Sequence, residues 1–175
     1  MRVLGIDCGS RATGFGLIES DEEQHRVVTF GVIQFHFKDT FSQRLVKIHS
    51  EIQKLILQYS PQAAAVEDQF YLSNFKSVMK LGQTKGVAIF TLANAGIPVF
   101  EYSPLEIKSA VTGYGRAEKS QVQVMVRNLL KLETLPQPDD AADALALAIC
   151  HTHTMATQRR LSLAEPASRL TKGFV

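Results

Sequence analysis

The sequence has few features of an exported or membrane-bound protein. It holds two cysteines, Cys8 and Cys150, among 175 residues, too few for the disulfide framework of a small secreted domain. No apolar run reaches the roughly 18 residues that a membrane-spanning helix needs, because the richest one, residues 86–100, is interrupted by polar residues, glycine and proline. The chain starts directly with a strand-like run and has no signal-peptide pattern. We therefore expect a cytoplasmic protein with reduced cysteines and no membrane contact.

Several signatures of nucleotide-binding and hydrolytic enzymes are also missing. The sequence contains no Walker A motif, and the glycines near its start lack the G-x-G-x-x-G spacing of dinucleotide-binding proteins. It contains no serine or cysteine in a nucleophile elbow. These absences argue against a P-loop ATPase, a Rossmann dehydrogenase and a serine hydrolase.

The charge is unevenly distributed, although its net value is only +2. Residues 72–131 hold eight basic and three acidic side chains, whereas residues 132–155 hold four acids and no lysine or arginine. A basic segment beside an acidic cluster suits a polyanion held against a metal-binding site. An ordinary solvated surface would give the same counts, so charge alone does not decide between the two interpretations.

The hydrophobic pattern predicts one α/β domain with a mixed sheet and helices on its faces. The strands are expected over residues 3–7, 15–18, 26–37, 63–66 and 98–102. The helices are expected over residues 40–60, 75–95, from 103, 118–133 and 139–155. Short connections between the first three strands indicate an antiparallel meander. We expect the domain to occupy residues 1–155 and to be followed by a basic tail, 156–175, that is mobile.

Four carboxylates fall at the ends of these predicted elements. Asp7 ends the first strand beside small residues, and Glu67 ends the fourth. Neighbouring parallel strands present such ends at one edge of the sheet. Asp140 and Asp143 are three residues apart at the start of the last helix, so they share one face. The alanines around them allow that helix to lie close to the sheet.

Clustered carboxylates raise one another's pKa, and a hard divalent cation removes this conflict. Mg²⁺ prefers oxygen ligands, and two such ions about 4 Å apart promote phosphodiester hydrolysis. Each acid alone has an ordinary explanation as a strand-end residue or as a favourable charge at a helix N-terminus. The four together predict a magnesium site. We expect Asp139 to cap the last helix and Asp68 to face solvent. His151 and His153, two residues apart, lie on different helix faces and predict no metal site.

Five segments resemble the RuvC family of Holliday-junction resolvases, in order over residues 1 to about 153. They are LGIDCGSRATGFG at 4–16, VEDQF at 66–70, LGQTKGVA at 81–88, AEKSQV at 117–122 and DAADALA at 140–146. The resemblance implies an RNase H-like fold with a five-stranded mixed sheet, and a homodimer with two active sites. It also implies paired symmetric nicks in four-way DNA junctions that leave 5′-phosphate and 3′-hydroxyl ends. The expected setting is recombination and DNA repair alongside the RuvA and RuvB branch-migration proteins.

The resemblance also assigns residues. Its metal-binding catalytic acids correspond to Asp7, Glu67, Asp140 and Asp143. They would hold two Mg²⁺ ions, with Mn²⁺ as an alternative. Lys108 and Lys119 match basic positions that engage DNA phosphate, and we count Lys119 with the catalytic residues. Phe70 matches an aromatic residue that contacts bases at the junction. Cys8 stands where the family usually has proline, and we expect little effect on metal binding.

Three points stay open at this stage. Phe75, close to Phe70 in sequence, is expected either to stack on bases or to pack in the core. The helix over 75–95 is the candidate dimer interface, with burial against its own sheet as the alternative. The start of the chain also resembles the phosphate loop of actin-like ATPases and sugar kinases, but these need two such domains and 175 residues hold one. A module that binds branched DNA without cutting it is a further alternative, although such a protein would be expected to have lost an acid.

Overall fold

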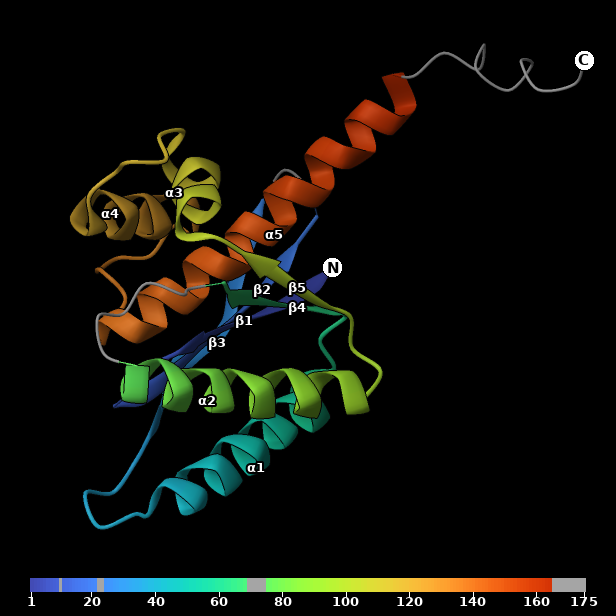
Figure 1. Cartoon of the computed structure of the whole chain (residues 1–175). Helices are drawn as coiled ribbons and strands as arrows, with labels where there is room; N and C mark the ends of the chain where they lie inside the picture. Colours follow the sequence, from blue (N-terminus) through green and yellow to red (C-terminus); the bar gives the residue numbers. More distant parts are fainter. Residues whose placement is uncertain (10, 22–23, 69–74, 165–175) are drawn as a thin grey trace, which may run out of the picture.

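A single five-stranded mixed sheet forms the centre of the computed structural model, which describes residues 1–9, 11–21, 24–68 and 75–164 (Figure 1). Its strands are β1 (Arg2–Cys8), β2 (Ala12–Ser20), β3 (His25–Gln34), β4 (Ala63–Glu67) and β5 (Val99–Tyr102). They lie in the order β3-β2-β1-β4-β5. β1, β2 and β3 are antiparallel, whereas β4 pairs parallel with both β1 and β5. The predicted meander and mixed sheet are therefore confirmed.

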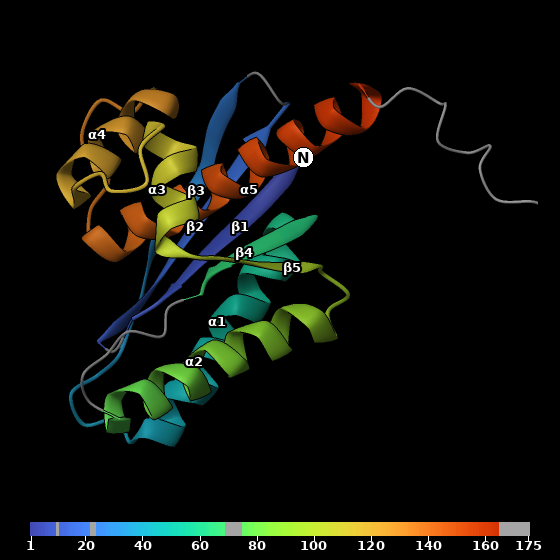
Figure 2. The same ribbon diagram turned by 45° about the horizontal axis from the view of Figure 1, so that its top comes forward.

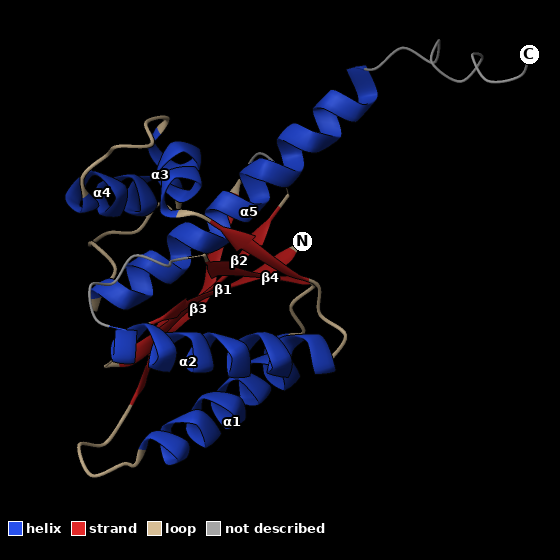
Figure 3. Ribbon diagram, viewed as in Figure 1, coloured by secondary structure: helices blue, strands red, loops and turns tan. Residues whose placement is uncertain are grey.

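Helices cover both faces of this sheet (Figures 2 and 3). They are α1 (Phe41–Tyr59), α2 (Phe75–Asn94), α3 (Pro104–Thr112), α4 (Lys119–Leu129) and α5 (Asp139–Ala164). α1 and α2 pack on one face through aliphatic residues such as Ile48, Ile52 and Leu92. α5 crosses the other face, and α3 and α4 pack against it. No helix in the described part of the chain is long and apolar enough to cross a membrane.

Local sequence signals fix where the helices begin and end. Thr40 caps α1 in a reciprocal capping box with Gln43, which satisfies two backbone N–H groups that the helix itself leaves unpaired. Ser103 makes the same arrangement with Glu106 at the start of α3, with Pro104 in the first turn. The start of α3 is therefore fixed directly after β5, at the edge of the sheet where Glu67 also lies.

α5 lies unusually close to the sheet because glycines face it. A Cβ atom on Gly5 of β1 would overlap the carbonyl oxygen of Ala144, and one on Gly14 of β2 would overlap that of Asp140. On the helix side the contact is made by alanines, which are almost fully buried. The backbone of α5 is therefore in direct contact with the backbones of β1 and β2, as the small residues around the predicted acids indicated.

Several predicted boundaries are wrong. α5 continues to Ala164 instead of ending near residue 155, so the first part of the expected tail is helical, while residues 165–175 lie outside the described residues. β2 begins at Ala12 rather than at residue 15, which places Gly14 inside a strand and not in a turn. Asp139, expected as a cap, is the first residue of α5. The side chain of Phe75 is exposed, so it does not pack in the core.

Candidate active site

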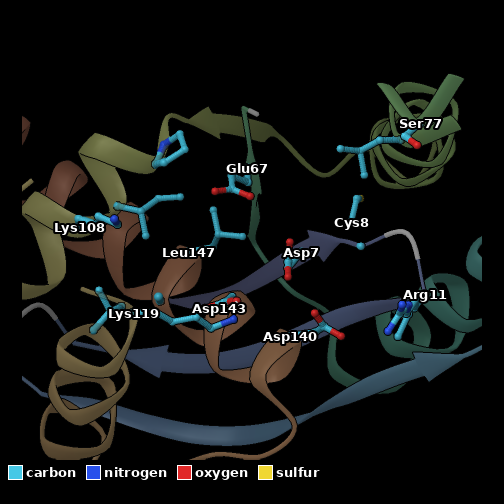
Figure 4. Close-up of a pocket in the computed structure, with 17 residues that line it drawn as sticks. Asp7, Cys8, Arg11, Glu67, Ser77, Lys108, Lys119, Asp140, Asp143 and Leu147 are labelled. Atoms are coloured by element: carbon cyan, nitrogen blue, oxygen red, sulfur yellow. Dashed lines mark hydrogen bonds and ion pairs between the residues drawn. The ribbon is translucent and has the colours of Figure 1, made fainter. Parts of the chain in front are cut away.

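The four predicted acids line one cavity of about 710 Å³ at the edge of the sheet (Figure 4). Asp7 and Glu67 come from the ends of β1 and β4, and Asp140 and Asp143 from the first turns of α5. In Figure 4, Asp7 lies in the middle of the group, with Glu67 on one side and the two α5 residues on the other. The structure thus brings together acids that are up to 136 positions apart in the chain.

Strand register explains why Asp7 and Glu67 are neighbours. β1 and β4 are parallel, with Gly5 opposite Ala65 and Ile6 opposite Val66. Side chains alternate between the two faces along a strand. Ile6 and Val66 belong to the core beneath α1 and α2, so the residues that follow them, Asp7 and Glu67, turn towards α5. This is the face on which Asp140 and Asp143 lie.

The electrostatics of the cavity disfavour four bare carboxylates. The pKa of Asp7 is raised to about 7 by burial and by the charges of Asp143, Glu67 and Asp140, although Lys119 opposes the shift. Burial, followed by the charge of Asp143, raises the pKa of Glu67 as well. Burial also raises the pKa of Asp143, and its hydrogen bond from Lys119 only partly offsets this. The site therefore holds a protonation penalty that a bound cation would relieve.

The donor set fits a hard divalent cation. All four cavity acids offer oxygen ligands, and the partly buried position of Asp7 makes its ionisation depend on a nearby positive charge. Within the described residues, no three acidic, histidine or cysteine side chains are close enough to enclose an ion by themselves. Mg²⁺ does not need such a cage, because it keeps several waters and takes oxygens from substrate phosphate. The arrangement thus suits an open metal site better than a closed structural one.

Two lysines flank the acids on one side. The Nζ atom of Lys119, at the start of α4, lies 2.9 Å from Oδ2 of Asp143 and 3.4 Å from Oδ2 of Asp139. Its side chain is still 53% exposed, so the ammonium can reach a ligand in the cavity. Lys108 of α3 lines the same cavity, and its charge lowers the pKa of Glu67. Both predicted lysines therefore lie where a phosphate in the cavity would meet them.

Lys85 is a residue that the sequence did not single out. Its side chain is only 13% exposed and forms ion pairs with Asp68, at 3.0 Å, and with Glu101. Asp68 was expected to face solvent, but it is 40% exposed and is held by this ion pair. Lys85 therefore ties α2 to the residue directly after Glu67 and to β5. The only signal in the sequence was its place in the LGQTKGVA segment.

Other predicted residues have simpler positions. The thiol of Cys8 lines the cavity, but burial and the charge of Asp7 raise its pKa to about 12, so it stays protonated and is a poor metal ligand. His151 is buried and hydrogen-bonded to Tyr102 at 2.8 Å, and His153 is bonded to the carbonyl oxygen of Ala110. As expected, the two histidines form no joint site. Phe70 lies outside the described residues.

Comparison with known proteins identifies the family. The family model for crossover junction endodeoxyribonuclease RuvC matches residues 3–151. The chain belongs to the RuvC family. A RuvC of Koribacter versatilis is 49% identical over 92% of this chain and 98% of its own length, and one from Syntrophomonas wolfei is 51% identical over 88% and 90%. The solved structure titled T. thermophilus RuvC in complex with Holliday junction substrate superposes with a TM-score of 0.85, at 31% identity over 90% of this chain and 96% of that one.

Membership in the RuvC family confirms the predicted RNase H-like fold and the nuclease class. It decides against the actin-like ATPase alternative, because the match covers nearly the whole described domain and the family is one of endodeoxyribonucleases. It also implies dependence on a divalent metal ion. Which residues of this chain perform the reaction follows from the cavity rather than from the family name.

Proposed function

We propose that this chain is a Mg²⁺-dependent endonuclease that resolves four-way DNA junctions by paired symmetric nicks, in recombination and DNA repair. The observation that carries the proposal is the convergence of four carboxylates, from two strand ends and one helix start, on a single cavity. Burial and mutual repulsion leave Asp7 with a pKa near 7. Such a site favours the binding of divalent ions and, through them, of a DNA phosphate.

Asp7, Glu67, Asp140 and Asp143 would hold two Mg²⁺ ions, with Mn²⁺ as an alternative. Bound ions of this kind lower the pKa of an attacking water and offset charge on the leaving oxygen. Asp7 fits a central role because it is the most buried of the titrating acids and its ionisation responds to the charges of the three others. Asp140 and Asp143, one turn apart on α5, would contact ions from the opposite side to the strand ends.

The lysines supply the positive charge that a phosphodiester requires. The ammonium of Lys119, now hydrogen-bonded to Asp143, would bind a non-bridging oxygen of the scissile phosphate and stabilise the extra charge of the transition state. Lys108 would bind the same strand from α3. In the reaction, the oxygen of water bonds to phosphorus, the bond to O3′ breaks, and O3′ takes up a proton. The products are a 5′-phosphate and a 3′-hydroxyl. Phe70 is proposed to stack on a base at the junction.

Paired nicks need two active sites, so we propose a homodimer whose two-fold axis matches that of the junction. The outer side of α2 is suited to this contact. Phe75, Met79 and Phe90 expose apolar surface there, and a Cβ on Gly82 or Gly86 would meet no other atom. Sedimentation of the wild type and of a Gly86→Arg variant tests this interface, since a monomeric variant is the expected result.

The family resemblance also predicts action alongside RuvA and RuvB, within cells and on the same junction. Adding these two proteins to a cleavage reaction tests that prediction directly. A change in the rate or position of nicking supports it. An unchanged rate and pattern at saturating RuvA and RuvB would argue against it.

The deciding experiment is cleavage of a synthetic mobile four-way junction with Mg²⁺. The wild type should give symmetric nicks that a DNA ligase can reseal, and Asp7→Asn or Asp140→Asn should lower the rate by at least about 100-fold. Asp139→Asn is the matched control, because Asp139 is adjacent to Asp140 but does not line the cavity. It should retain activity within about threefold. Equal cutting by wild type and Asp7→Asn would refute the role of Asp7.

A further inference from the structure

We propose that Arg11 binds a DNA phosphate on the side of the cavity opposite Lys108 and Lys119, so that the cleaved strand is held by cations at both ends of the acid cluster. This inference rests on the proposed junction-cleaving function and adds a DNA-binding residue to it. It assigns to Arg11 the phosphate next to the scissile one, not the scissile phosphate itself.

The position of Arg11 is set by the short connection between β1 and β2. The N–H of Gly9 donates to the carbonyl oxygen of Asp7 at 3.1 Å, so the chain turns sharply after the acid. A Cβ on Gly9 would lie 3.7 Å from Oδ1 of Asp140. This turn therefore runs directly beside Asp140. Arg11 lines the same cavity, and in Figure 4 it lies beyond Asp140, with the two lysines on the far side of the acids.

The guanidinium of Arg11 differs from the other cations near the site because it has no partner. Within the described residues it makes no hydrogen bond or ion pair, even though Asp140 is a close neighbour in the cavity lining, and its side chain is exposed. Lys119 is paired with Asp143, and Lys85 with Asp68 and Glu101. Arg11 is thus a charge at the rim that the fold itself does not neutralise.

A DNA strand across the cavity would meet this charge. The acids on the Asp140 side repel the phosphates of that strand, and a bound metal ion compensates this only locally. A guanidinium at the rim provides planar paired donors for phosphate oxygens, which offsets the repulsion and fixes the direction of the strand. The lysines perform the same function beyond Glu67 and Asp143. The scissile phosphate would then be held between two anchored neighbours.

Binding measurements in an Asp7→Asn background separate this role from catalysis. The affinity for a labelled four-way junction is measured in Mg²⁺ over a range of KCl concentrations. Arg11→Gln should weaken binding about 5- to 10-fold at about 0.1 M salt and reduce the slope of log K against log salt by roughly one. Arg26→Gln is the matched control, because Arg26 is exposed, pairs with Glu19 and lies at the other end of the sheet. It should change the affinity less than about twofold.

A second readout locates the contact. Single neutral methylphosphonates are placed along the strand, one phosphate at a time. The substitution next to the scissile phosphate on the Arg11 side should weaken binding of the Asp7→Asn parent but leave that of its Arg11→Gln derivative unchanged. If the parent binds the junction and the effects of Arg11→Gln and of every methylphosphonate simply add, the Arg11 inference is wrong and the proposed function stands. If the parent itself fails to prefer the junction over duplex DNA, both are wrong.

Discussion

The two faces of the sheet are packed in opposite ways. On the α1 and α2 face, large aliphatic side chains such as Leu17, Ile48 and Ile52 fill the space between layers. On the α5 face the space is almost absent, because glycines of β1 and β2 are in contact with the α5 backbone. The first arrangement buries apolar surface and stabilises the fold. The second fixes the distance between Asp7 on a strand and Asp140 on a helix.

This difference suggests a division between stability and positioning. Side chains in an aliphatic core can shift and repack when one of them is changed, at a cost in stability. Two backbones in direct contact cannot, so any added atom must move α5 with its acids. We therefore expect substitutions on the α5 face to abolish catalysis, and substitutions on the α1 and α2 face to lower stability first.

The strongest test of this division is Gly14→Ala. The new methyl group would overlap the carbonyl carbon and oxygen of Asp140, so the start of α5 must move away from β2. A displacement of about 1 Å in a catalytic group costs on the order of 100-fold in rate. We expect at least this loss in single-turnover junction cleavage. Gly82→Ala is the control, since a Cβ there meets nothing, and it should retain full cleavage.

The sequence predicted much of this architecture because its signals are local. The spacing of Ile48 and Ile52 within a polar pattern predicts α1, and a strand-end acid predicts the place of Asp7. The end of α5 was missed because the sequence beyond residue 155 is no longer amphipathic, although helix formation continues to Ala164. Lys85 was missed because its partners, Asp68 and Glu101, are 17 and 16 positions away in the chain and only the fold brings them together.

On the other face, Leu17→Ala should show the opposite behaviour. Leu17 is 1% exposed in the core beneath α1 and α2, and truncating a buried leucine typically costs about 3 kcal/mol of unfolding free energy. The acids on the α5 side would keep their positions. Urea unfolding should show the loss, while single-turnover cleavage at low temperature stays within about threefold of wild type. A rate loss as large as that of Gly14→Ala would end the division between the faces.

A smaller effect is expected from pH, and it arises on the α5 face alone. The pKa of Asp7 is raised from 3.8 to about 7 in the folded state, so its protonated form favours folding. This contribution is complete below the unfolded pKa and is lost as pH rises through about 7. Without metal, the wild type should lose about 2 kcal/mol between about pH 5.5 and pH 8. Burial raises the pKa of Glu67 and Asp143 in the same direction.

Urea titrations in EDTA measure this loss, and Asp7→Asn provides the comparison. The variant has no carboxyl group to ionise at this position, so its stability should depend less on pH. Adding Mg²⁺ at about pH 8 should restore the wild type more than the variant. Wild-type stability that rises with pH in EDTA would contradict the assignment.

Lys85 gives the smallest predicted effect and the finest test, because it crosses the division. It belongs to α2, yet its ammonium holds Asp68 directly after Glu67 and lowers the pKa of Glu67 through its charge. We expect Lys85→Met to weaken Mg²⁺ binding about 10-fold by calorimetry without DNA, in the range seen for groups that support metal ligands. Lys85→Arg should restore most of the affinity, since it keeps both charge and hydrogen bonds. Glu101→Gln, which leaves the Asp68 pair intact, should have less effect than Lys85→Met. If Lys85→Met alters only the unfolding free energy, then α2 contributes packing alone, and positioning of the acids is confined to the α5 face.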